Sequence, residues 1–398
     1  MQAFRSTGLP PLPRGTLELK VLPLSKTSVW TARSIWCQFI SNIVTFFNPE
    51  MFQERYHYVN ATDKFALLID DRLTLANWWS IPWSLHMLGP EWGLQIFARK
   101  NNIHVFEGIV REYKLANVYI DTLQSKYGLN ESLPAHWIHD VHFMLTKQFW
   151  MGLRGEHILI LQDHGVPVRR WNTVASQVIL KNIFEYAYAG APWSFVERKH
   201  DSNSSKIDPT NLKAIRQDAH GLWKADGGGN GGFSYRKRSW MMAFGIDSSS
   251  SVEDLLNSSV ESFNYLGHEN EDWLWGRILS AHRHGVAPTR LECQFAAETL
   301  MECDGVLGVH NYATYHSVQD TVHLVQSAAK EFFQVETPIF RVRLTTERVA
   351  RQSPWLNSWR HLKYYSELSA PMECTVPEGN WASPLRKLSM RIFGSLAW

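Results

Sequence analysis

Residues 157–165 read HILILQDHG, an apolar run that passes directly into polar side chains. A short apolar run bounded by polar residues is typical of a strand that is buried in a sheet. The run FALLI at residues 65–69 has the same character, and Asp70, Asp71 and Arg72 follow it at once. The two runs therefore predict buried strands whose carboxyl ends carry polar groups.

Helix signals alternate with these strands along the chain. Residues 78–88 are expected to be helical because their pattern stops at a Gly-Pro pair, and residues 271–284 because Gly285 would end the helix. Residues 94–97 predict a further strand. The alternation predicts an α/β sandwich with a mostly parallel central sheet. Ligands of such sheets bind beyond the carboxyl ends of the strands, so the polar residues there are candidates for a site.

The composition is that of an ordered globular protein, with 44% hydrophobic and 20% charged residues in 398. A net charge of +2 gives no general attraction to nucleic acid, and we expect no nucleic-acid partner. Four cysteines without a CxxC pair exclude a disulfide-built scaffold and argue against a structural zinc site. The 18 tryptophans suit either a large core or the flat apolar faces of sugars.

Three parts are expected along the chain: an N-terminal extension at 1–58, a main domain at 59–345 and a C-terminal extension at 346–398. No span reaches the roughly 18 apolar residues of a membrane-spanning helix. The chain as written is therefore expected to be soluble, either cytoplasmic or peripheral to secretory-pathway membranes. Residues 385–396 combine apolar residues at helical spacing with unopposed basic ones. They predict a basic amphipathic helix that rests on an anionic membrane surface or docks on the protein itself.

Residues 227–232 read GGGNGG and allow three interpretations. They can form a flexible turn, or a dinucleotide-binding G-x-G-x-x-G, although the residues before them are a poor strand for that motif. They can also form a loop whose backbone approaches a ligand closely, with Asn230 offering amide hydrogen bonds. Residues 233–236 predict a strand after this loop.

Acids and histidines supply the remaining candidates for chemistry. Residues 269–272 read ENED at the start of a predicted helix, where acids are favoured by the helix dipole and can also serve as a general base. Asp163 and His164 follow a buried strand and offer donors for Mn²⁺ or Mg²⁺. His310 is either a further ligand from distant sequence or an ordinary hydrogen-bonded histidine.

Taken in order, five segments resemble a known family: FWMGLRGEHILILQDHG, EYAYAGAPW, GNGGFSYRKRSWM, ENEDWLW and GVHNY. The family is glycosyltransferase-like, is catalogued as a domain of unknown function, and is related to nucleotide-sugar transferases of the GT-A fold. Upstream, LLIDDR and PEWGLQIF resemble its first strand and a later one. The resemblance covers about residues 64–315 and implies a GT-A-like (Rossmann-like) sandwich.

The resemblance implies an enzyme that transfers a sugar from a nucleoside-diphosphate sugar to a hydroxyl of a carbohydrate or glycoconjugate acceptor. The implied donor-binding residues are Asp70, Arg72, Gln162, Trp193, Asn230, Gly231, Gly232 and Phe233. Glu271 or Asp272 is implied as the catalytic base, which corresponds to inversion at the anomeric carbon. Asp163, His164 and His310 are implied as ligands of Mn²⁺ or Mg²⁺.

The metal motif departs from the family pattern, which has Gln, any residue, then Asp. Here Asp163 comes directly after Gln162, and His164 occupies the acid position. Asp163 can substitute through a small register shift, His164 can ligate instead, or metal binding is weak or lost. The last case would leave a non-catalytic carbohydrate- or nucleotide-sugar-binding protein on the same fold.

Overall fold

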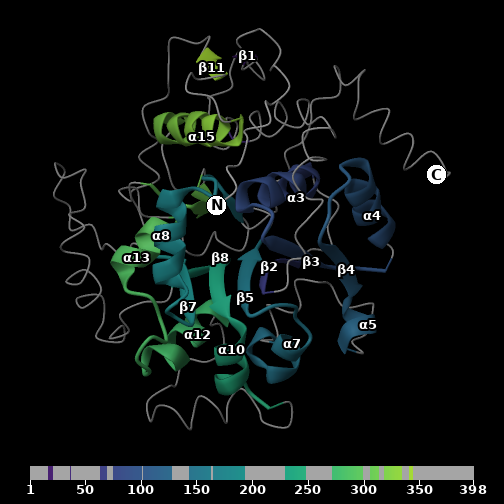
Figure 1. Cartoon of the computed structure of the whole chain (residues 1–398), viewed down its shortest axis with the longest axis vertical. Helices are drawn as coiled ribbons and strands as arrows, with labels where there is room; N and C mark the ends of the chain where they lie inside the picture. The colour runs from purple at the N-terminus through teal and green to yellow at the C-terminus, as the bar shows by residue number, and fades with distance from the viewer. Residues whose placement is uncertain are drawn as a thin grey trace, which may run out of the picture.

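A six-stranded sheet with the order β4-β3-β2-β5-β8-β7 forms the centre of the protein (Figure 1). The computed structural model describes residues 17–20, 36, 63–69, 75–100, 102–127, 143–162, 165–192, 229–247, 271–298, 305–312, 318–333 and 340–343. The strands are β2 (Lys64–Ile69), β3 (Trp92–Ala98), β4 (Val118–Thr122), β5 (His157–Leu161), β7 (Tyr188–Ala191) and β8 (Asn230–Lys237). Strands β2 to β5 are parallel, and β8 runs antiparallel to both β5 and β7. The mixed α/β fold with a mostly parallel sheet is confirmed.

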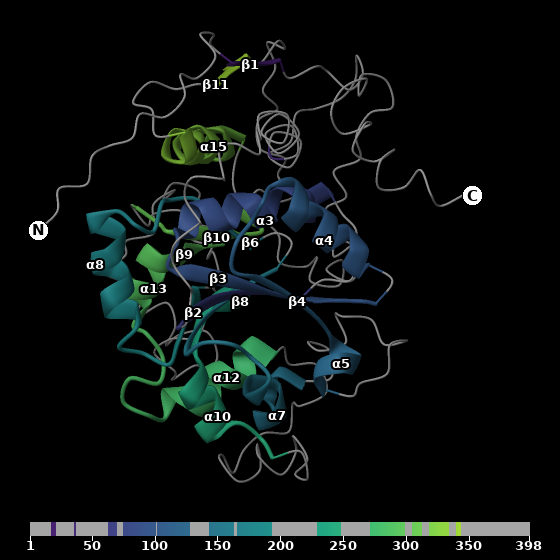
Figure 2. The ribbon, with the colours of Figure 1, turned by 45° about the vertical axis from the view of Figure 1, so that its right-hand side comes forward.

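Helices cover both faces of this sheet. Figure 2 shows α3 (Leu75–Leu88) and α4 (Ile103–Glu112) on one side, with α7, α10 and α12 on the other. These three helices are α7 (Lys147–Met151), α10 (Arg238–Phe244) and α12 (Glu271–Ser280). The main body also contains α5 (Leu123–Tyr127), η1 (Phe143–Leu145), α8 (Val174–Ile183) and α13 (Thr289–Phe295). A sheet covered on both faces needs strands that are apolar throughout, which explains why FALLI and HILIL do not alternate with polar residues.

The side chains of β2 show how one strand serves two cores. Ala66 and Leu68 pack into the core beneath α3 and α4, whereas Phe65, Leu67 and Ile69 pack into the core beneath α7 and α12. Successive side chains of a strand point to opposite faces, so an unbroken apolar run is required here. The predicted strands at 65–69, 94–97 and 157–161 and the helix at 78–88 are confirmed.

A smaller three-stranded sheet lies beside the carboxyl end of β5. It has the order β6-β10-β9 and consists of β6 (Gly165–Pro167), β9 (Ala296–Ala297) and β10 (Gly308–His310). Strand β10 is antiparallel to β6 and parallel to β9. This sheet brings residues near position 310 back to the segment that follows HILIL.

A further helix and a two-stranded sheet lie above α3 (Figures 1 and 2). Helix α15 (Val318–Phe333) packs on α3, where Phe332 stacks on Trp83 with ring centroids 4.4 Å apart. Strand β1 (Leu17–Lys20) pairs in parallel with β11 (Phe340–Arg343), so the two ends of the described chain meet.

Two predictions need correction. The helix expected at 271–284 ends at Ser280. The glycine-rich segment opens strand β8 at Asn230 instead of a helix, so the dinucleotide interpretation is wrong, because that motif must open a helix. The predicted basic helix at 385–396 lies outside the described residues. None of the helices described is long and apolar enough to span a bilayer.

Candidate functional site

The strand order changes direction between β2 and β5. From β2 the chain builds outward through β3 and β4, and then returns to add β5 on the other side of β2. Adjacent loops at such a switch point leave in opposite directions, so a ligand crevice is expected at the carboxyl ends of the two strands. FALLI and HILIL, the runs singled out in the sequence, are the strands on either side of this point. Gln162 is the first residue beyond β5, whereas Asp70, Arg72, Asp163 and His164 lie outside the described residues.

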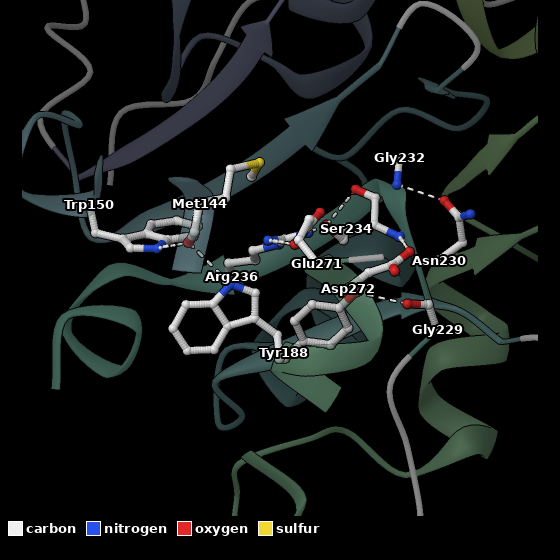
Figure 3. Close-up of polar contacts among 12 residues, drawn as sticks. Met144, Trp150, Tyr188, Gly229, Asn230, Gly232, Ser234, Arg236, Glu271 and Asp272 are labelled. Atoms are coloured by element: carbon white, nitrogen blue, oxygen red, sulfur yellow. Dashed lines mark hydrogen bonds and ion pairs between the residues drawn. The ribbon is translucent and has the colours of Figure 1, made fainter. Parts of the chain in front are cut away.

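The antiparallel direction of β8 brings its first residues to the same edge. Phe233 pairs with Leu161, the last residue of β5, and the Gln162 amide donates to the Gly232 carbonyl at 2.9 Å. The Asn230 side chain accepts a hydrogen bond from the Gly232 amide at 2.6 Å, which fixes the turn (Figure 3). The Asn-Gly-Gly segment is therefore an ordered turn at this edge of the sheet. Trp193, two residues beyond β7, lies outside the described residues.

Gly232 packs against two side chains from distant parts of the sequence. A methyl group on its Cα would collide with His310 Nε2 and would lie 2.6 Å from Gln162 Oε1. Only a residue without a side chain allows this approach. The structure therefore brings three of the predicted residues together, from the ends of β5 and β10 and the start of β8.

His310 is held by an acid that the sequence analysis missed. Glu298 Oε1 lies 2.9 Å from His310 Nδ1, and both side chains are buried. Asn311 Nδ2 lies 3.3 Å from His310 Nε2. Glu298 belongs to no motif, and only the pairing of β9 with β10 brings it to the histidine.

Gly231 packs against a buried ion pair on the other side of the turn from His310. Arg236 donates from both terminal nitrogens to Glu271, at 2.7 and 2.8 Å, so both carboxylate oxygens are engaged (Figure 3). Arg236 also donates to Ser234 Oγ at 3.1 Å, and the Ser234 hydroxyl donates to the Gly231 carbonyl at 2.8 Å. Burial is the largest single influence and would lower the pKa of Arg236, but the charge and hydrogen bonds of Glu271, together with Tyr188 and Asp272, raise it. The arginine is therefore a permanent cation.

Asp272 ties the helix α12 to the turn. Its Oδ2 accepts a hydrogen bond from the Gly231 amide at 2.8 Å, and its position at the helix start is favoured by the helix dipole. Tyr188 closes the cluster by donating to the Gly229 carbonyl at 2.8 Å. Burial, together with the acids Asp272 and Glu271, raises the pKa of Tyr188 well above its usual value, so the phenol remains a donor.

Phe233 turns away from both clusters. Its ring is fully buried and packs between Trp171 and Phe295, with centroids 6.3 and 5.4 Å away. The ring supports the turn from the core. Successive side chains of β8 point to opposite faces of the sheet. Phe233 and Tyr235 therefore lie in the core beneath α3 and α4, whereas Ser234 and Arg236 lie on the face that carries Glu271.

The described parts of the chain contain no group of three His, Cys, Asp or Glu side chains able to hold a metal ion. Of the three predicted metal ligands, His310 lies among the described residues, and its Nε2 and the Oε1 of Gln162, a predicted donor-binding residue, both lie close to Gly232. An imidazole nitrogen and an amide oxygen are both donor types that Mn²⁺ accepts.

Comparison with known proteins agrees with the motifs. Residues 129–310 match the family model described as "Protein of unknown function (DUF5672)". This match confirms the resemblance to a family catalogued as a domain of unknown function. No curated protein matches the chain.

Two solved structures are similar to the chain at low identity. A galactosyltransferase, LgtC in complex with donor and acceptor sugar analogues, is 10% identical, with 66% of this chain and 95% of that chain covered and a TM-score of 0.38. Mouse xyloside xylosyltransferase 1 in its apo form is 11% identical, with 64% and 99% covered and a TM-score of 0.41.

Proposed function

We propose that this protein is a glycosyltransferase that moves a sugar from a nucleoside-diphosphate sugar to a hydroxyl acceptor, with metal assistance and inversion. The observation that supports it most is that Gln162 and His310 contact the Asn230–Gly232 turn at Gly232, and Asp272 contacts the same turn at Gly231, at the carboxyl end of β5. The family-like motifs carry these same residues. The proposed transferase domain is residues 59–345.

Donor binding is assigned to the crevice between β2 and β5. The side-chain amides of Gln162 and Asn230 would meet the polar parts of the donor, because both residues lie at the carboxyl end of β5. Asp70 and Arg72 would extend this surface from the end of β2, and Trp193 would contribute an apolar face to the sugar.

The cation is assigned to the end of the crevice at His310, where Asp163 or His164 would complete the ligand set. When bound, Mn²⁺ or Mg²⁺ would neutralise charge that develops on the leaving diphosphate. The protein's own part is to hold the imidazole and the Gln162 amide oxygen beside Gly232.

The base is assigned to Asp272 in preference to Glu271. A general base needs a carboxylate oxygen that can reach the acceptor hydroxyl. Both oxygens of Glu271 are bound by Arg236, which leaves Glu271 the role of counter-ion. Asp272 lies on the turn itself, through its bond to the Gly231 amide. Deprotonation of the acceptor would accompany attack on the anomeric carbon, with the diphosphate departing from the opposite face.

The test measures donor hydrolysis and transfer with a panel of nucleotide sugars, together with nucleotide binding in Mn²⁺ and in chelator. Asp272→Asn should lower the rate by about 10²- to 10⁴-fold while nucleotide binding persists. Asp247→Asn, which removes an exposed carboxylate paired to Lys147, is the matched control and should leave the rate unchanged. Binding that ignores chelator, without turnover on any donor, would establish the non-catalytic binding protein instead.

A further inference from the structure

Glu298 lies directly beyond β9, at a point that strand pairing makes adjacent to His310. Gly308 pairs with Ala296 and Val309 with Ala297, so the next residues of the two parallel strands are neighbours. The exposed fractions of Glu298 and His310 are 3% and 4%. Burial excludes water from this contact, and the 2.9 Å separation is that of a hydrogen bond.

The chemistry of the pair determines which ring nitrogen carries the proton. A carboxylate oxygen accepts hydrogen bonds, so the contact fits an N–H at His310 Nδ1 that donates to Glu298 Oε1. A neutral imidazole with a proton on Nδ1 has its lone pair on Nε2. The amide nitrogen of Asn311 is a donor and lies 3.3 Å from Nε2, which agrees with this tautomer, and a cation bound at Nε2 would replace this hydrogen bond.

The atoms around Nε2 show where its lone pair points. The ring edge faces Gly232 so closely that no side chain fits there, and Gln162 Oε1 lies near the same point. The imidazole is thus held by Glu298 on one side and by the glycine turn on the other.

We propose that Glu298 is a positioning residue that holds His310 with Nδ1 protonated and presents Nε2 as an electron-pair donor to a divalent cation at Gly232. A histidine ligand that donates its other N–H to a carboxylate is more basic and better oriented, and loss of such a partner weakens metal binding about 10- to 100-fold. The binding of a cation at this place depends on the proposed function, whereas the assignment of the tautomer does not.

The tautomer is measured on the full chain labelled with ¹⁵N-histidine, by long-range ¹H–¹⁵N correlation at about pH 8. The His310 signals are those that disappear in His310→Gln. The wild type should show a protonated Nδ1 and an unprotonated Nε2. Glu298→Met, which removes the acceptor at similar volume, should shift His310 toward the other tautomer. A protonated Nε2 in the wild type, or an unchanged spectrum in Glu298→Met, would overturn the proposal.

The cation is measured separately, by electron paramagnetic resonance titration of free Mn²⁺. Glu298→Met should bind Mn²⁺ about 10- to 100-fold more weakly than the wild type. Glu292→Gln, which neutralises another fully buried acid on α13, is the matched control and should bind like the wild type. Equal affinity in Glu298→Met and wild type would overturn the positioning role. Absence of Mn²⁺ binding in the wild type, with the expected tautomer present, would overturn the metal dependence in the proposed function and leave the tautomer assignment intact.

Discussion

Separating the two partners of the buried ion pair should destabilise the fold far more than removing both. Arg236 is fully buried, and Glu271 receives two of its hydrogen bonds. Breaking a buried pair by removing one partner costs about 3–5 kcal/mol, because the other charge stays in a medium of low dielectric.

The surroundings of the pair predict which single change is worse. Arg236→Met leaves Glu271 beside Asp272, two carboxylates without their cation, so it should cost about 5 kcal/mol. Glu271→Leu leaves Arg236 close to Asp272, which also raises the pKa of the guanidinium, so it should cost only about 3 kcal/mol. The double variant removes both charges and should lose about 1 kcal/mol, chiefly the contacts of Arg236 with Tyr188 and Ser234.

The assay is urea unfolding followed by tryptophan fluorescence, with the free energy taken from the midpoint at constant slope. The double variant should be more stable than either single variant. If the two single losses instead add up in the double variant, the residues are not coupled and the assignment of Glu271 as counter-ion is wrong.

Three further measurements test other parts of the structure. Gly232→Ala should lose about 1–3 kcal/mol by overpacking and should also weaken Mn²⁺ binding by displacing His310. Gly93→Ala, which presses on the core ring of Phe65 near the start of β2, should lose similar stability and keep binding. Retained binding in the first variant contradicts the site. Burial lowers the pKa of His157, so the unfolded state takes up the proton more readily and stability should fall as the pH drops below about 6.5. His157→Gln should flatten that loss in urea midpoints at about pH 7.5 and 5.5, and an unchanged slope rejects the assignment. Cys293 is disulfide-bonded, so the denatured, unreduced chain should titrate with fewer than four thiols, and a full count of four would exclude the bond.

Strand patterns allowed the architecture to be predicted well, because burial on both faces of a parallel sheet leaves a local signature. FALLI contains no polar residue, HILIL contains only His157 at its start, and polar residues follow each run directly. The alternation of polar and aromatic residues along β8 also indicated a buried polar cluster, which the sequence analysis did not predict. Ser234 and Arg236 are polar residues facing away from Phe233 and Tyr235, and a polar face on a central strand indicates a buried polar cluster.

The sequence by itself determined the α/β class, the two strands at the crevice and the order of the motifs along the chain. These follow from periodicity and from the direction in which parallel strands end, which are local properties. Only the tertiary structure decided that Glu271 neutralises Arg236, that Phe233 supports the turn from the core, and that Glu298 holds His310. Such roles depend on which charge or ring lies within a few ångströms across the fold, and spacing along the chain carries no record of that.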